Sequence, residues 1–335
     1  MKFITNVLLL LLSSVLSATT TACEDKHFGE IRGLNWYGFE VWGRPTCVPQ
    51  HSIEEYIQQI CDMGFNHLRI PFSIEFVKKG DWTEMDHFFE VVQRYPINIT
   101  LDAHRVYNTH QAYDPTEGEN IDEFINHWTT ILTRYGGNDT TTGTPKYGGR
   151  LVGVDVFNEY QGTDPERWNG MLHQIVTKLE SRFPEQFVYW VGGTRWGGSL
   201  MGISLEDLPF RDRIYYTLHK YSFSSGPSNA FQQNWDEAFG VYVDTGRVSV
   251  GEWGFRSEEP YQVEWAKQFI AYMKQRKINK TFFWVAHMSD DTHALYIDCD
   301  KIDYPKLDVI KTLWEGDDNG ANNNKRYLRS TRTLS

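Results

Sequence analysis

The chain has 335 residues and a formal net charge of −11, and aromatic residues make up 15% of it. This charge argues against a nucleic-acid partner, because proteins that bind nucleic acids usually carry a basic stripe. An uncharged ligand meets no such conflict, and aromatic side chains can supply both core packing and flat stacking surfaces. The length suits one large α/β domain with a sizeable core.

The N-terminal segment MKFITNVLLLLLSSVLSA combines a basic start, an apolar run and small residues. This pattern predicts a secretory signal peptide over 1–22, with cleavage after Ser17, Ala18 or Ala22, and its apolar stretch is too short to span a membrane. We therefore expect a secreted, extracellular protein that does not associate with a membrane after cleavage. Lipid attachment at Cys23 is an alternative, which Thr20 disfavours. The catalytic domain is expected over 23–314, and the polar segment 315–335 is expected to be a disordered tail.

Short apolar or aromatic runs alternate with segments that have apolar residues at helical spacing, such as SIEEYIQQICDMG. The runs lie at 31–37, 66–70, 97–101, 151–157, 187–191, 213–218, 248–251 and 281–285. Strands that alternate with helices form parallel βαβ units, and eight such units close a (β/α)8 TIM barrel. An open, doubly wound sheet is the alternative, but the first run is followed by no glycine-rich phosphate-binding turn.

Polar or aromatic residues lie at the ends of all eight runs. In chain order they are Asn35 and Trp36, Arg69, Asp102 and His104, Asn158 and Glu159, Trp196, His219 and Tyr221, Glu252, and Trp284. In a barrel these ends converge on one face, where such enzymes keep their active sites. Packing requirements alone would rarely give such ends on nearly all eight runs, so the pattern predicts one shared site.

Two of these residues are glutamates that close apolar runs, Glu159 after LVGVDVFN and Glu252 after RVSVG. A carboxylate is costly to place at the end of a buried strand unless the site uses it. Cleavage of a glycosidic bond requires two carboxyl groups, one that gives up a proton and one that remains ionised. A structural ion pair with a strand-end arginine is the simpler alternative for either glutamate, and a hydrogen-bonded core position is the alternative for His104 and His219.

Six motifs in register with the eight runs, RGLNWYGFE, GFNHLRIPFS, LDAHR, VFNE, LHKY and GEWG, resemble those of the family 5 glycoside hydrolases. The first and third motifs are most similar to the endo-β-1,4-glucanase branch of that family. The resemblance covers 31–313, and it implies a single TIM barrel that cleaves β-1,4-glucosidic bonds of cellulose-like glucans with retention of configuration.

The resemblance also implies a role for each matching residue. Glu159 is expected to be the general acid and then the general base, and Glu252 the nucleophile. Arg69 and Tyr221 are expected to support the ionised Glu252, and Asn158 to bind the sugar 2-hydroxyl. The remaining substrate-binding candidates are His104, His219, Trp284, Asn35 and Trp36. Trp36, Trp42 and Trp196 fit a sugar platform and a core position equally well.

Two departures from the family pattern concern the choice of substrate and leave the predicted reaction unchanged. The proline that usually follows the catalytic Asn-Glu pair is Tyr160, and the segment after the eighth run contains Ala286, His287 and His293. A family 5 enzyme that acts on β-mannan, xyloglucan or β-1,3-glucan is therefore one alternative. A non-catalytic carbohydrate-binding or cell-wall recognition protein is another, although such a protein would be expected to lack at least one catalytic residue.

No metal or other cofactor is expected, because hydrolysis by two carboxyl groups needs none. The alternative is a zinc or calcium site formed by His287, Asp290, Asp291 and His293. Four cysteines in an exported chain favour two disulfides, with three possible pairings. Barrel geometry favours Cys47 with Cys299 and Cys23 with Cys61. Glycosylation sequons begin at Asn98, Asn138 and Asn279. We expect a monomer whose partner is a β-glucan.

Overall fold

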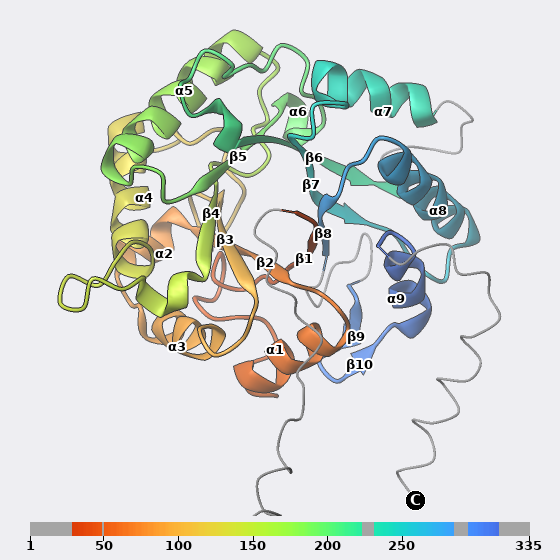
Figure 1. The fold of residues 1–335 in the computed structure, drawn as a ribbon, viewed down its shortest axis with the longest axis horizontal. Coiled ribbons are helices and arrows are strands. Elements are labelled where there is room, and N and C mark those ends of the chain that lie inside the picture. The colour runs from red at the N-terminus through yellow and green to blue at the C-terminus, as the bar shows by residue number, and fades with distance from the viewer. Residues whose placement is uncertain (1–28, 49, 223–230, 285–293, 315–335) are drawn as a thin grey trace, which may run out of the picture.

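Eight parallel strands, β1 to β8, close into a barrel in sequence order in the computed structural model, which describes residues 29–48, 50–222, 231–284 and 294–314 (Figure 1). The strands are β1 (Ile31–Asn35), β2 (His67–Ser73), β3 (Asn98–Arg105), β4 (Leu151–Asp155), β5 (Val188–Gly192), β6 (Ile214–Tyr221), β7 (Val248–Gly254) and β8 (Lys280–Trp284). The barrel closes where β1 pairs with β8, from Ile31 beside Lys280 to Asn35 beside Trp284. This arrangement confirms the predicted (β/α)8 fold.

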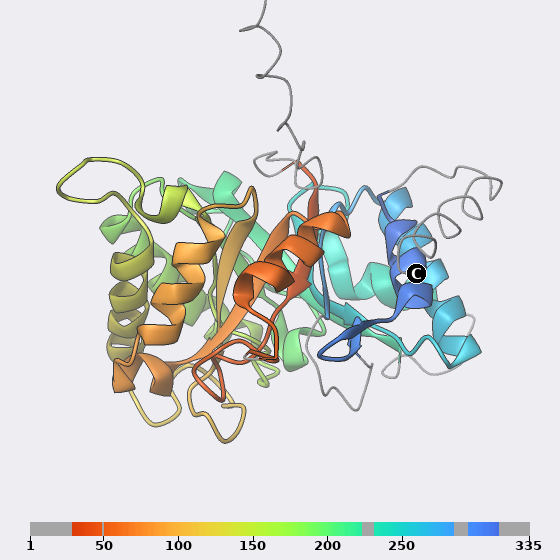
Figure 2. The same ribbon diagram turned by 90° about the horizontal axis from the view of Figure 1, so that it is seen from below.

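Helices surround the barrel and cover the outer face of its sheet (Figures 1 and 2). They are α1 (Ile53–Asp62), α2 (Ile74–Lys79), α3 (Thr83–Val92), α4 (Ile121–Tyr135), α5 (Pro165–Arg182), α6 (Thr194–Gly197), α7 (Phe231–Phe239), α8 (Pro260–Gln275) and α9 (Tyr304–Lys311). Capping boxes start α1, through Ser52 and Glu55, and α4, through Asn120 and Glu123. Within the described ranges, no helix combines the length and the apolarity that a membrane crossing needs.

Four strands, β2, β3, β6 and β7, continue three or four residues beyond the apolar runs that predicted them, and β5 continues by one. The polar residues that seemed to follow β3, β6 and β7 therefore lie within the strands. Side chains alternate between the two faces of a strand, so Asp102 and His104 share the inner face of β3, as His219 and Tyr221 share that of β6. The apolar pattern breaks off early because these inner positions belong to the site at the barrel mouth.

Large rings fill the opposite end of the barrel interior. Trp190 and Phe282 pack there against the buried His67, whose ring hydrogen-bonds the Thr100 hydroxyl at 2.8 Å. Gly33 makes this packing possible, because a Cβ atom at Gly33 would lie 2.3 Å from the Phe282 ring. Burial lowers the pKa of His67 to about 3, so this histidine is neutral. The interior is therefore a packed core that supports the site from below.

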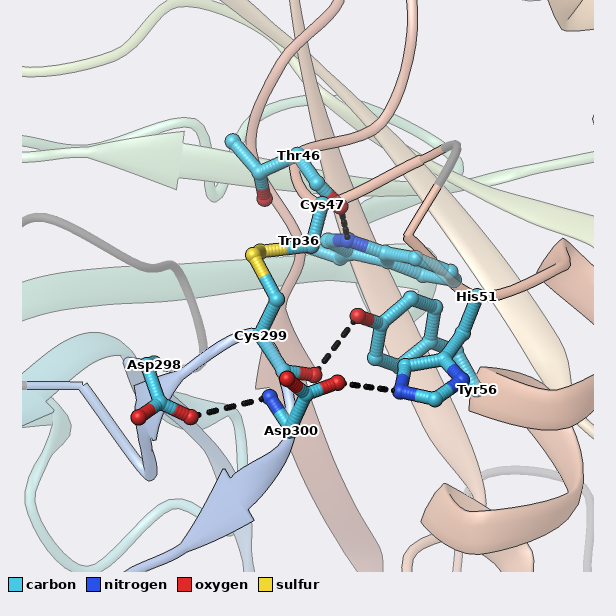
Figure 3. The surroundings of a disulfide bond; sticks show 8 residues. All are labelled: Trp36, Thr46, Cys47, His51, Tyr56, Asp298, Cys299 and Asp300. Carbon is cyan, nitrogen blue, oxygen red and sulfur yellow. Dashed lines mark hydrogen bonds and ion pairs between the residues drawn. A yellow bond between two sulfur atoms is a disulfide. The ribbon is translucent and has the colours of Figure 1, made fainter.

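A disulfide joins Cys47, in the connection after β1, to Cys299, between β9 (Tyr296–Asp298) and β10 (Lys301–Ile302), with their Cα atoms 5.4 Å apart. Figure 3 shows its surroundings, where the Tyr56 hydroxyl donates to the Cys299 carbonyl at 2.7 Å. The predicted Cys47–Cys299 pairing is confirmed. Cys23, the predicted partner of Cys61, lies outside the described residues, as do the predicted signal peptide 1–22 and the predicted disordered tail 315–335.

Replacing both Cys47 and Cys299 with serine is expected to lower the free energy of unfolding by about 2–5 kcal/mol, because the bond closes a loop of 252 residues in the unfolded chain. Denaturant titration of the double variant and the wild type, both without reductant, measures the difference. Equal midpoints and equal slopes would contradict a stabilising role for this bond.

Candidate active site

The Glu252 carboxylate lies on the inner face of β7, where it accepts hydrogen bonds from three side chains. Arg69 Nη1 donates to Oε1 at 2.7 Å, the Tyr37 hydroxyl donates to the same oxygen at 2.8 Å, and the Tyr221 hydroxyl donates to Oε2. Glu252 is buried. Burial on its own would raise its pKa. The charges of His219, Arg69 and His104 and the hydrogen bond from Tyr221 outweigh burial and lower the pKa to about 2. Glu252 is therefore ionised across the whole physiological range.

This lowered pKa predicts a pH-dependent contribution to stability. A carboxyl group with a lower pKa in the folded than in the unfolded chain stabilises the fold above its unfolded pKa, and that contribution is lost as the pH falls through the folded pKa. For Glu252 the window runs from about pH 4.5 down to about pH 2. The difference in unfolding free energy between wild type and Glu252→Gln should fall by about 3 kcal/mol across this window. A difference that stays constant between pH 5 and pH 2 would contradict the lowered pKa.

The Arg69 guanidinium is buried in the centre of the barrel and holds the site together. Five oxygen atoms surround it: Asp155 Oδ2 at 2.8 Å, Asp102 Oδ2 at 3.1 Å, Glu252 Oε1 at 2.7 Å, and the side-chain oxygens of Asn35 and Asn158 at 3.0 Å each. Burial opposes the charge of Arg69, but the three carboxylates raise its pKa well above the ordinary value. Because a guanidinium has five N–H donors in a rigid fork, Arg69 fixes the relative positions of residues from β1, β3, β4 and β7.

Glu159 lies beyond the end of β4 and is more accessible than Glu252, with 19% of its side chain exposed against 2%. Its backbone has a φ angle of 45°, a left-handed conformation that is uncommon for residues other than glycine. His219 Nδ1 lies 2.8 Å from its Oε1, and Gln111 Nε2 donates to its Oε2 at 3.0 Å. The carboxyl group is thus held in one orientation beside the barrel mouth.

The two histidines connect the carboxylates to the rest of the site. His219 Nδ1 lies 2.8 Å from Glu159 and 3.7 Å from Glu252. Burial disfavours a charge on His219, but the two carboxylates outweigh burial and raise its pKa. His104 Nδ1 lies 2.7 Å from Asp102 Oδ2, and its Nε2 lies 3.4 Å from Asn158 Nδ2.

One carboxylate oxygen of Glu159, one of Glu252 and a ring nitrogen of His219 lie within 4.8 Å of one another. Such a group has the size of a metal site, but its atoms already have protein partners: Glu252 accepts from Arg69 and two tyrosines, and His219 contacts Glu159. The separation matches the close spacing of a nucleophile and an acid/base in retaining glycosidases, whereas inverting enzymes hold their carboxyl groups further apart.

Trp36 occupies a different place from the one we predicted. It lies between Asn35 and Tyr37, and the alternation of side chains turns it outwards, where its ring packs against Tyr56 of α1 and Phe88 of α3. Only 2% of Trp36 is exposed. It offers no ring face to a sugar, so the expected binding role is corrected to a core role.

The structure shows how the chain accommodates one of the two departures from the family pattern, Tyr160 in place of the usual proline. Tyr160 is buried and stacks on Trp168 of α5 with ring centroids 4.5 Å apart, so its side chain fixes the backbone just past Glu159. Ala286, His287 and His293, together with Asp290 and Asp291, lie outside the described residues. The same holds for the side chain of Trp284, whose backbone pairs with Asn35 at the end of β8.

Three residues of the site were not predicted: Tyr37, Gln111 and Asp155. Tyr37 could have been found, because it is two positions beyond Asn35 and so shares its inner face. Asp155 ends β4 and resembles an ordinary strand-end residue until Arg69 is placed beside it. Gln111 lies in a long connection, and the sequence gives no signal that it reaches Glu159.

A closed parallel barrel with two closely spaced carboxyl groups at its mouth is the arrangement typical of glycoside hydrolases. The family description "Cellulase (glycosyl hydrolase family 5)" matches residues 24–289. The chain therefore belongs to glycosyl hydrolase family 5.

Curated relatives and solved structures agree with this assignment. Cellodextrinase A of Ruminococcus flavefaciens is 23% identical over 58% of this chain and 60% of its own length. Endoglucanase C of Acetivibrio thermocellus is 22% identical over 50% of each chain. The chain thus spans 50–60% of the length of these relatives. An endocellulase from Pyrococcus horikoshii, solved with cellotetraose, shares the fold with a TM-score of 0.73 at 23% identity, over 85% of this chain and 93% of that chain. The catalytic domain of a Xanthomonas campestris endoglucanase gives 0.71 at 19% identity, over 85% and 94%.

Proposed function

We propose that this protein is a secreted, retaining glycoside hydrolase that cleaves β-1,4-glucosidic bonds of cellulose-like glucans, with Glu252 as the nucleophile and Glu159 as the acid/base. The observation that carries the proposal is the unequal environment of two carboxyl groups whose oxygens lie within 4.8 Å. Glu252 is buried and held ionised by Arg69 and two tyrosines, while Glu159 is partly exposed beside it. This asymmetry is what double displacement requires.

In the first step, a Glu252 oxygen attacks the anomeric carbon while the bond to the leaving oxygen breaks. The proton of Glu159 passes to that oxygen, so the aglycone leaves as an alcohol and Glu159 becomes a carboxylate. The result is a covalent glycosyl ester of Glu252. In the second step, Glu159 takes a proton from water as the water oxygen attacks the anomeric carbon, and Glu252 is released. Two inversions at one carbon give net retention.

A glucan substrate is supported by exposed aromatic rings on connections that follow the carboxyl ends of strands. Trp42 follows β1, Tyr113 follows β3 and Trp196 follows β5, and they are 52%, 49% and 54% exposed. Flat rings of this kind stack against the apolar faces of sugars. The backbone N–H of Trp196 donates to the Tyr160 carbonyl at 3.0 Å, which places the Trp196 loop next to Glu159. The names of the relatives, a cellodextrinase and an endoglucanase, favour β-1,4-glucan over other β-glycans.

Release of reducing ends from carboxymethyl cellulose, glucomannan, xyloglucan and laminarin tests the substrate. The highest kcat/KM is expected on the cellulose derivative. A higher kcat/KM on one of the other three polysaccharides would leave the proposed reaction intact but would contradict the proposed cellulose-like substrate. No hydrolysis of any of them, combined with measurable binding, would instead support a non-catalytic carbohydrate-binding protein. Glu159→Ala, which removes the acid/base, serves as the inactive control in each assay.

A further inference from the structure

Gln111 lies in the connection between β3 and α4 and reaches the oxygen of Glu159 that His219 does not contact. Its amide Nε2 donates to Glu159 Oε2 at 3.0 Å, and His219 Nδ1 lies 2.8 Å from Oε1. Each oxygen of the carboxyl group therefore has its own protein partner. The two partners come from opposite directions along the chain, 48 residues before and 60 residues after Glu159.

The backbone around Gln111 is attached to the segment that carries Glu159. Gln161 bonds this connection twice, because its N–H donates to the Tyr113 carbonyl at 3.1 Å and its Nε2 donates to the Ala112 carbonyl at 3.4 Å. Arg167 Nη2 adds an ion pair with Asp114 Oδ2 at 2.7 Å. The amide of Gln111 is thus held in place by contacts independent of its own bond to Glu159.

We propose that Gln111 is a positioning residue that stabilises the ionised form of Glu159 during the reaction; this inference rests on the acid/base role proposed for Glu159. Among the residues that the structure describes, the other titratable groups that face Glu159 are His219 and Tyr221 from β6 and Glu252 from β7. Glu252 is negative and opposes a negative charge on Glu159. The Gln111 amide, which donates to Oε2, offsets this repulsion and favours the carboxylate form of Glu159.

The donor acts at a defined point of the cycle. Glu159 gives its proton to the leaving oxygen and becomes a carboxylate while Glu252 becomes a neutral ester. An amide N–H directed at Oε2 lowers the energy of that carboxylate and holds it in the orientation needed to take a proton from water. A hydrogen bond to an ionised group is stronger than one to a neutral group, so the contact favours proton release over proton retention.

The pH profile of kcat/KM separates this role from a merely structural one. Gln111→Met keeps the length of the side chain and removes the donor, so Glu159 should retain its proton to higher pH. The alkaline limb of the profile is expected to move up by about 0.5–1 pH unit, with about a fivefold fall in kcat at the optimum. Gln111→Glu adds a like charge, and the limb should move further in the same direction.

Gln161→Met is the matched control, because it removes only the 3.4 Å side-chain bond to the Ala112 carbonyl. The backbone bond from Gln161 to Tyr113 and the Arg167–Asp114 ion pair remain and keep the connection in place. The alkaline limb of Gln161→Met is expected to coincide with that of the wild type. An unmoved limb in Gln111→Met, or an equal shift in Gln161→Met, would overturn the inference while leaving the proposed reaction intact. Full activity of Glu159→Ala would overturn the proposed reaction itself, so the two failures are distinguishable.

Discussion

Glu252→Gln is expected to lower kcat/KM on a soluble cellulose derivative by about 10⁴-fold or more, because the amide cannot form the glycosyl ester that the reaction requires. The fold should survive, since the amide oxygen can still accept from Arg69 and Tyr37, and Arg69 keeps its contacts with Asp102 and Asp155. Initial rates of reducing-sugar release measure the loss, and circular dichroism checks the fold.

Glu206→Gln is a matched control for this variant. Like Glu252, Glu206 accepts from an arginine and a tyrosine, from Arg247 Nη2 at 2.5 Å and from the Tyr216 hydroxyl at 2.7 Å, but it lies in the connection before β6 and, within the described part of the chain, lacks a second tyrosine. Its activity is expected to match that of the wild type. A folded Glu252→Gln variant that retains even a tenth of wild-type turnover would remove Glu252 from the nucleophile role.

Arg69→Met is expected to lower the free energy of unfolding by about 3–5 kcal/mol. The substitution leaves three buried carboxylates, of Asp102, Asp155 and Glu252, without the cation that compensates them. Removing one partner of a buried ion pair is costly because the remaining charge stays desolvated. Activity should fall as well, since the pKa of Glu252 rises when Arg69 is lost.

Arg94→Met provides the comparison for Arg69→Met. Arg94 pairs with Glu54 on the surface, where 56% of its side chain is exposed, and surface pairs contribute about 0–1 kcal/mol. Urea titration of the two variants measures both effects. A loss below about 1 kcal/mol for Arg69→Met would show that the buried cluster is not held together by this guanidinium.

The order of strands could be read from the sequence because each one is a short apolar run between helical segments. The C-terminal ends of the strands could not be read from the sequence, because the inner positions at the barrel mouth are polar. His219 and Tyr221 illustrate the limit: they follow an apolar run, yet they belong to β6. The same residues that obscure the end of the strand identify the site.

Contacts between connections that are distant in the sequence could not be predicted from local sequence patterns, and only some followed from the geometry of the barrel. The Cys47–Cys299 bond followed from barrel geometry, because the two connections are neighbours on one rim. Gln111 differs, since its contact with Glu159 depends on the path of a long connection between β3 and α4. Gln111 was a site residue that the sequence did not reveal, whereas Trp36 was a candidate that the structure removes from the site. Its position in the RGLNWYGFE motif suggested the site, but the alternation of side chains assigns it to the core.

The anomeric configuration of the first product tests the central claim most directly. Proton NMR during early hydrolysis of a soluble cello-oligosaccharide distinguishes the two anomers before mutarotation mixes them. Double displacement through Glu252 predicts the β-anomer first, with the α-anomer appearing only later. An initial α-anomer would mean a single inverting displacement, and it would contradict the roles proposed for both glutamates.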